Sequence, residues 1–119
     1  MTDCVFCNII AGTAPADLLY EDDDLIVIRD IRPVAPVHLL VIPRKHITSL
    51  NELQPEDTNL TAHMLLTVPR IARQLLGDDA AFRTVINTGA DAGQTVFHLH
   101  VHIIAGRPFI GHLFTRGLR

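Results

Sequence analysis

Apolar residues recur every three or four positions between Pro55 and Gly77, and this spacing predicts one long amphipathic helix. The residues of the predicted buried stripe are Leu60, Met64, Val68, Ile71 and Leu75. Pro55 suits the first turn of this helix and Gly77 suits its C-terminal cap. Pro69 lies inside the segment and predicts a kink, which leaves the continuation of the helix past Leu66 open.

The other apolar segments are short and predict a small sheet preceded by a short helix. Helical spacing of apolar residues between Asp3 and Gly12 predicts that short helix. Strands are predicted in LLYEDDDLIVIRD, which reads as a hairpin, and in HLLVIP, FRTVIN and VFHLHVHII. The LIVI run is apolar enough for burial on both faces. Short links favour antiparallel pairing, so the predicted fold class is α+β: an antiparallel sheet with one long helix and a short N-terminal helix.

Composition narrows the class of protein. A chain of 119 residues with 48% hydrophobic and 19% charged residues fits one globular domain. A net charge of -3 provides no basic field for a polyanion, so we expect no bulk nucleic acid as a ligand. No apolar run approaches the roughly 20 residues of a membrane helix, and Asp3 stands where an export signal needs basic residues. We therefore expect a cytoplasmic protein with no membrane partner.

Three histidines occupy alternate positions in the segment HLHVHII, namely His98, His100 and His102. In a strand, alternate side chains share one face at a spacing of about 6.7 Å, so the apolar residues between the histidines face the core. The alternative interpretation is that the three histidines are ordinary polar residues on a solvent-exposed strand face. A zinc ion accepts two such imidazoles more readily than three, because the third lies too far along the strand. At least one imidazole is then expected to act as a nucleophile or an acid and base, and a histidine nucleophile suits phosphorus.

The loop NTGADAGQTV precedes the triad and is rich in hydrogen-bond donors. Asn87, Gln94 and Thr95 supply polar side chains, while Gly89 and Gly93 leave backbone amides accessible. Loops of this composition cradle phosphate groups. We therefore expect a phosphate-bearing ligand beside the histidines.

Three segments together resemble the histidine triad nucleotide-binding family, nearest to its Hint branch: CVFCNIIAG, DIRPVAPVHLLVIPRKHI and GQTVFHLHVHII. The resemblance covers about residues 1–107, as one domain, with 108–119 as a divergent tail within that domain or at a dimer interface. It implies a homodimer whose sheet extends across the interface, and no organic cofactor. It also implies hydrolysis or transfer of nucleoside monophosphates that carry an amine, acyl or phosphate leaving group. The implied ligands are purine nucleotides such as AMP or GMP, or aminoacyl- and amino-nucleotides.

The resemblance also assigns roles by position. It implies that His100 is the nucleophile, that His102 contacts the phosphate and helps to orient or protonate it, and that His38 lies beside the nucleophile. Asp30 matches the carboxylate that accepts both ribose hydroxyls, although an aspartate before a proline loop also caps turns. The residues matched to the apolar base pocket are Phe6, Ile9, Ile28 and Ile31, of which Phe6 and Ile28 also suit an ordinary core. Asn87 and Thr95 match phosphate or leaving-group contacts, and Gln94 joins them as a predicted substrate-binding donor.

Cys4 and Cys7 fit a metal site, a redox pair or ordinary core thiols. The redox interpretation lacks the preceding strand of a thioredoxin motif. The resemblance implies a structural zinc ion, one per chain, held by Cys4, Cys7, His46 and His98. His63 shows no partner pattern and is expected as a surface residue.

The tail PFIGHLFTRGLR departs from the short tail of Hint relatives. Its residues Phe109, Phe114, Arg116 and Arg119 are expected to change leaving-group selection, and His112 is expected to be an ordinary residue. The leading functional hypothesis is a nucleoside phosphoramidase. A nucleotide-binding regulatory or scaffold protein and a dinucleoside polyphosphate hydrolase stay open as alternatives, although the latter branch commonly has proline where this chain has Phe97.

Overall fold

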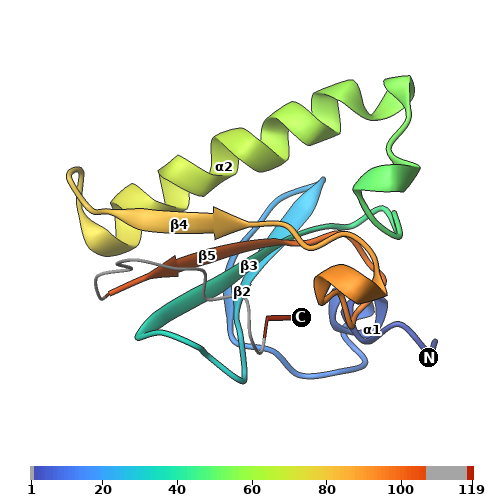
Figure 1. Ribbon diagram of the computed structural model, residues 1–119, viewed down its shortest axis with the longest axis horizontal. Helices are drawn as coiled ribbons and strands as arrows, with labels where there is room; N and C mark the ends of the chain where they lie inside the picture. Colours follow the sequence, from blue (N-terminus) through green and yellow to red (C-terminus); the bar gives the residue numbers. More distant parts are fainter. Residues whose placement is uncertain (1, 107–117) are drawn as a thin grey trace.

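Five antiparallel strands form one sheet in the order β1-β2-β3-β5-β4 (Figure 1). The computed structural model describes residues 2–106 and 118–119. The strands are β1 Leu18–Glu21, β2 Leu25–Arg29, β3 Val37–Pro43, β4 Phe82–Val85 and β5 Val101–Ala105. The helices are α1 Val5–Ala11 and α2 Thr58–Leu76, with single 3-10 turns at Leu50–Glu52, Pro55–Asp57 and Ala90–Ala92. The predicted α+β class, with one long helix and one short N-terminal helix, is confirmed.

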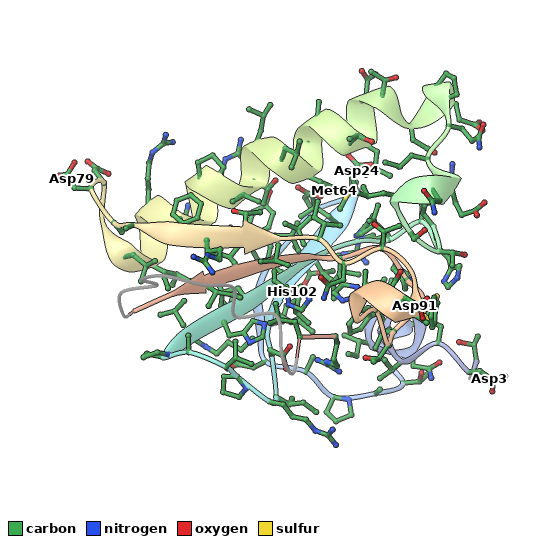
Figure 2. All side chains as sticks on the ribbon, viewed as in Figure 1. Asp3, Asp24, Met64, Asp79, Asp91 and His102 are labelled. Atoms are coloured by element: carbon green, nitrogen blue, oxygen red, sulfur yellow. The ribbon has the colours of Figure 1, made fainter. Side chains whose placement is uncertain are left out.

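The two faces of the sheet carry two separate apolar clusters. Leu25 and Val27 of β2 pack with Met64, Val68 and other residues of α2 on one face. Ile26 and Ile28 alternate with them and pack with Phe6 of α1 on the other face. Figure 2 shows Met64 pointing from α2 toward the sheet. The prediction that β2 is buried on both faces is therefore confirmed.

Helix α2 differs from its prediction at its N-terminal end, whereas Gly77 caps its C-terminal end as predicted. Pro55 belongs to a separate 3-10 turn, and α2 begins at Thr58. The helix then runs unbroken through Pro69 to Leu76. Pro69 has no N–H to donate to Leu65, but Leu65 is 50% exposed, so water can reach the carbonyl that is left over.

The predicted stripe of α2 holds for Met64, Val68 and Ile71 and is wrong for Leu75. Leu75 is 42% exposed, whereas Ala72 is 1% exposed. In the last two turns the buried residues are therefore Ile71 and Ala72, which lie three and four residues after Val68 and continue its face of the helix.

The triad segment also differs from its prediction, because β5 begins only at Val101. His98 and His100 precede the strand, where the N–H of Leu99 donates to the carbonyl of Ile47 at 2.6 Å. The alternation of faces nevertheless continues through the segment. Leu99, Val101 and Ile103 belong to the cluster beneath α2, and the three histidines lie on the opposite side.

Candidate functional site

Three buried imidazoles lie in a row on the face of the sheet opposite α2. His38 is on β3 and His102 is on β5, which pair so that His38 is opposite Ile104 and Leu40 is opposite His102. The rings of His38 and His102 have centroids 5.1 Å apart, and those of His100 and His102 lie 5.0 Å apart. Figure 2 shows His102 near the centre of the molecule. Residues far apart in the sequence thus form one continuous imidazole surface.

Hydrogen bonds determine which nitrogen of His102 carries the proton. The backbone N–H of Val34 donates to Nδ1 of His38 at 3.1 Å, so the proton of neutral His38 is on Nε2. That Nε2 lies 2.9 Å from Nδ1 of His102 and donates to it. Neutral His102 therefore carries its own proton on Nε2. This N–H is buried and has no hydrogen-bond partner among the residues that the structure describes.

His100 has the opposite arrangement and presents a lone pair. Its Nδ1 donates to the backbone carbonyl of His98 at 2.6 Å, which leaves Nε2 unprotonated in the neutral ring. Within the described ranges, Nε2 is buried and makes no hydrogen bond. Burial lowers the pKa of His100, and the backbone oxygens of His98 and Arg119 partly oppose this effect. In the part of the chain that the structure describes, an imidazole lone pair and an imidazole N–H thus lie side by side without hydrogen-bond partners.

Burial also keeps the other two imidazoles neutral. The pKa of His102 falls to about 3, mainly through burial and then through the neighbouring His100, His38 and Arg119. Burial likewise lowers the pKa of His38, and the Asp30 carboxylate acts in the opposite direction. At neutral pH the imidazoles are therefore uncharged, and the charged groups beside them include the Asp30 carboxylate and the Arg119 guanidinium.

Asp30 directly follows β2 and is only 6% exposed. Its Oδ1 accepts a 2.8 Å hydrogen bond from the backbone N–H of Arg32, so the turn-capping interpretation of this residue is present in the structure. Its Oδ2 lies 3.4 Å from Nε2 of His38 and accepts no hydrogen bond from the described residues. The carboxylate thus braces a turn with one oxygen and keeps the other available.

The predicted base-pocket residues divide into buried and exposed ones. Phe6 and Ile28 are 0% and 2% exposed, and Ile9 packs beside them, as in an ordinary core. Phe6 contacts His100 edge-on, with ring centroids 4.9 Å apart. Ile31 is 74% exposed. The apolar wall next to the histidines is therefore formed chiefly by Phe6.

In the glycine-rich loop the structure corrects the prediction for Gln94. Its Oε1 accepts from the N–H of Gly89, and its Nε2 donates to the carbonyls of Thr48 and Val96. With both amide hydrogens in use and 2% exposure, Gln94 braces the loop and has no N–H left for a substrate. Asn87 is different, because its buried Nδ2 lacks a hydrogen-bond partner within the described part of the chain. Thr95 is exposed at the end of the loop.

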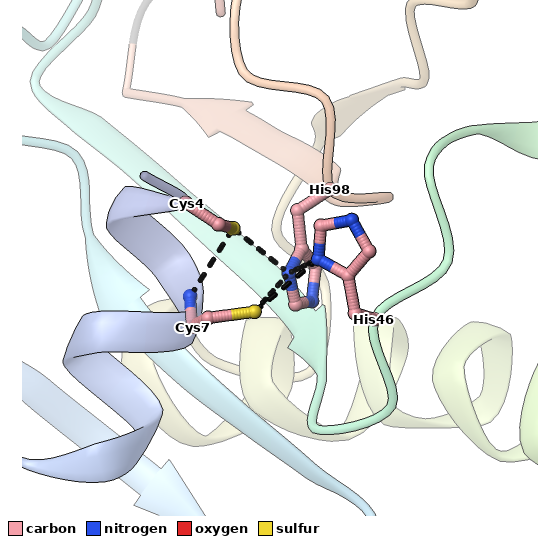
Figure 3. A group of neighbouring side chains, drawn as sticks. All are labelled: Cys4, Cys7, His46 and His98. Atoms are coloured by element: carbon pink, nitrogen blue, oxygen red, sulfur yellow. Dashed lines mark hydrogen bonds between the residues drawn. The ribbon is translucent and has the colours of Figure 1, made fainter. Parts of the chain in front are cut away.

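Cys4, Cys7, His46 and His98 form a second cluster, shown in Figure 3. One ligand atom from each residue lies within 4.8 Å of all the others. Sγ of Cys4 is 3.3 Å from Nδ1 of His98, and Sγ of Cys7 is 3.2 Å from Nδ1 of His46. Ligands of a tetrahedral zinc ion, at about 2.0–2.3 Å from the metal, lie roughly 3.3–3.8 Å from one another. The cluster is therefore close to the size of a four-ligand zinc site.

The protonation of His98 also suits a metal ligand. Its Nε2 donates to the carbonyl of Pro43 at 2.7 Å, so the lone pair on Nδ1 points into the cluster. Nδ1 of His46 lies only 3.1 Å away. Burial lowers the pKa of His98 to about 4, so its ring is neutral, as metal binding requires. A cation between the two nitrogens and the two sulfurs satisfies all four groups at once.

His63 is not the unpartnered surface residue that the sequence suggested. Its Nε2 lies 2.7 Å from Oδ2 of Asp22, and both side chains are about three-quarters buried. Asp22 also accepts from the hydroxyl of Tyr20 and from backbone N–H groups in the β1–β2 turn. These contacts attach the turn to α2. Sequence spacing gave no sign of this pair, which lies 41 residues apart.

Arg119 lies in the site on the side of Asp30. Its Nη2 is 3.3 Å from Oδ1 of Asp30, and its guanidinium carbon is 5.4 Å from the centre of the Phe6 ring. The predictions for Phe109, His112, Phe114 and Arg116 fall outside the described residues.

Comparisons with known proteins agree with this geometry. A family model described as scavenger mRNA decapping enzyme C-term binding matches residues 3–110. An uncharacterized HIT-like protein of Synechocystis is 49% identical over 108 residues, which is 90% of this chain and 93% of the relative. A HIT family hydrolase from Legionella pneumophila superposes with a TM-score of 0.86 at 39% identity, covering 89% of this chain and 95% of its own. A Zn-bound histidine triad family protein from Mycobacterium smegmatis has a TM-score of 0.77 at 39% identity, with coverages of 98% and 84%.

Within residues 2–106 and 118–119, neither helix has the length and apolar character needed to span a bilayer.

The lowered pKa of His102 predicts a pH dependence of stability. The unfolded chain protonates this histidine below about pH 6.5, but the folded protein resists protonation until about pH 3. The free energy of unfolding should therefore fall with decreasing pH below about 6.5, by up to about 1.4 kcal/mol per pH unit for each such histidine. Urea unfolding at pH 7, 6 and 5 measures this slope. His102→Asn should have a shallower slope than the wild type, and equal slopes would contradict the assignment.

Proposed function

The chain belongs to the histidine triad family, and we propose that it is a hydrolase that cleaves nucleoside phosphoramidates or acyl nucleotides of the AMP type through a nucleotidyl-His100 intermediate. The name of the Legionella neighbour supports the hydrolase class. The observation that carries the proposal is the buried Nε2 of His100, which has no hydrogen-bond partner among the described residues and which the His98 carbonyl keeps unprotonated. We place the chain nearest the Hint branch, on the sequence motifs around the triad.

The chemistry follows from the two imidazoles. Nε2 of His100 attacks the α-phosphorus, a P–Nε2 bond forms, and the bond to the leaving group breaks. The ring becomes cationic in this step, and its Nδ1–H then makes a charge-assisted hydrogen bond to the carbonyl of His98. Nε2–H of His102 is directed at the charge that develops on the phosphate oxygens. Attack of water on the phosphorus breaks the P–Nε2 bond, releases the nucleotide and restores neutral His100, and the proton that this water loses balances the one that an amine takes up when it leaves.

Recognition of the nucleotide uses Asp30 and Phe6. A buried carboxylate with a free oxygen accepts the hydroxyls of a ribose, and an aromatic wall suits a purine base. The buried Nδ2 of Asn87 is available for a phosphate or leaving-group oxygen. AMP, GMP and their amine or acyl derivatives are the ligands we propose.

We also propose that Cys4, Cys7, His46 and His98 hold one zinc ion. Four protein ligands close the coordination sphere, so the ion would supply cross-linking and no reactive position. It would join the start of α1, the loop after β3 and the triad segment. The zinc in the Mycobacterium smegmatis relative supports this proposal.

A homodimer is the third part of the proposal. β4 is an edge strand of the sheet. Large apolar side chains are exposed on β4 and α2: Phe82 is 37%, Leu65 50% and Leu66 64% exposed. Pairing through β4 would bury such residues and extend the sheet into a second copy, as the family resemblance implies.

The nucleophile is tested with His100→Ala and a fluorogenic adenosine phosphoramidate. The variant should lose at least about 1,000-fold in kcat/KM, because the covalent step disappears, while AMP still binds. His63→Gln serves as the control, since it removes a histidine on the other side of the sheet and should leave turnover unchanged. Quenching the wild type in alkaline denaturant should trap AMP on His100, as read by mass spectrometry. A wild type that binds AMP without releasing amine would instead be a binding protein, and faster cleavage of a dinucleoside polyphosphate would indicate the other branch.

Metal analysis tests the zinc site. Purified protein should contain about one zinc ion per chain, and chelation should lower the thermal midpoint because the binding free energy contributes to folding. Cys4→Ser combined with Cys7→Ser should resemble the chelated protein, both in metal content and in midpoint. Metal-free protein whose midpoint is unaffected by the double substitution would refute the site.

Light scattering tests the dimer. The mass of the wild-type particle in solution should be twice that of one chain, which is 13.2 kDa. Phe82→Glu should produce monomers, because it places a charge on the interface strand. Leu18→Glu, on the opposite edge strand β1 and 44% exposed, should stay dimeric. A monomeric wild type, or equal behaviour of the two variants, would exclude an interface at β4.

A further inference from the structure

The segment Leu118–Arg119 is held against the site at two points. Leu118 is 3% exposed and packs in a cluster with Ala35 and Ile104. The backbone oxygen of Arg119 accepts a 3.0 Å hydrogen bond from the N–H of Thr95. The apolar anchor and the backbone hydrogen bond together fix where the Arg119 side chain can reach.

The Arg119 side chain contacts two groups that we assign to the nucleotide. Its Nη2 lies 3.3 Å from Oδ1 of Asp30, the carboxylate proposed to accept the ribose hydroxyls. Its guanidinium lies over the ring of Phe6, the proposed wall of the base pocket, at 5.4 Å from the ring centre. The side chain is 19% exposed, so most of it fills space inside the site.

We propose that Arg119 is an internal competitor of the nucleotide, which must displace the guanidinium from Asp30 and Phe6 before its ribose and base can bind. This inference rests on the proposed function, because it takes Asp30 and Phe6 as the nucleotide contacts. A ribose that places its two hydroxyl groups on the two oxygens of Asp30 needs Oδ1, which the guanidinium contacts, and its base needs the face of Phe6 that the guanidinium covers. Arg119 therefore sets the apparent affinity of the site for every ligand that carries a nucleoside.

The size of the effect follows from the fraction of molecules in which Arg119 is docked. The apparent dissociation constant equals the intrinsic one divided by the fraction of open sites. If about nine molecules in ten hold Arg119 on Asp30, its removal tightens binding about tenfold. The competition acts at the nucleoside end of the ligand, so removal of Arg119 should raise the affinity for adenosine as much as the affinity for AMP.

Titration calorimetry of the full chain with AMP and with adenosine tests the proposal. Arg119→Ala should lower the dissociation constants of both ligands by a similar factor, of the order of tenfold. Arg73→Ala is the control: it removes an equal charge from the exposed end of α2 and should change neither constant. Leu118→Ala removes the anchor and keeps the guanidinium, so it should also lower the dissociation constants of both ligands.

The remaining outcomes separate the competitor from other roles. If Arg119→Ala weakens AMP and leaves adenosine unchanged, Arg119 assists the phosphate and the proposal is overturned. If the wild type binds AMP and adenosine and Arg119→Ala binds each with the same dissociation constant as the wild type, the competition is refuted while the proposed function stands. If neither protein binds either ligand, the proposed function fails and this inference fails with it.

Discussion

The hydrogen bond from Nδ1 of His100 to the carbonyl of His98 is the contact on which the site depends. His98 belongs to both side-chain clusters, because its carbonyl orients His100 while its ring lies in the cysteine–histidine cluster. The ring is itself fixed by the carbonyl of Pro43. Without the His98 carbonyl, either nitrogen of His100 could carry the proton. A closed metal site at this position would hold the backbone of the triad without taking part in the reaction.

Burial gives the site its second property, which is neutrality. Three imidazoles placed about 5 Å apart would repel one another if protonated, and removing them from water lowers their pKa values further. Neutral rings with fixed tautomers offer one lone pair and one N–H side by side. Such an arrangement costs folding stability at low pH, and the two apolar clusters on either side of the sheet offset that cost.

Periodicity and local residue chemistry predicted most of the fold, since the two helices and five strands arise from short-range patterns. The predictions failed at positions where tertiary contacts determine the local structure. Leu75 has helical spacing but lies off the sheet, and the strand of the triad begins at Val101 because Leu99 bonds to Ile47 instead. The sequence predicted Gln94 as a donor to phosphate, yet its amide hydrogens are donated to backbone carbonyls instead. The pairs His63–Asp22 and Arg119–Asp30 join residues 41 and 89 positions apart, and no local pattern encodes such contacts.

The burial of Asp30 is the physical basis of the proposed competition between Arg119 and a nucleoside. A carboxylate that is 6% exposed loses the solvation that water would give it, and the single N–H of Arg32 replaces only part of that loss. Two kinds of group can supply the missing hydrogen bonds: a cation such as the guanidinium of Arg119, or a pair of hydroxyl groups. The flat guanidinium and a flat base also both suit the face of Phe6. Under the proposed function, the need of Asp30 for hydrogen-bond donors suits both a nucleoside and the arginine of its own chain, and the anchoring of Leu118 would set the balance between them.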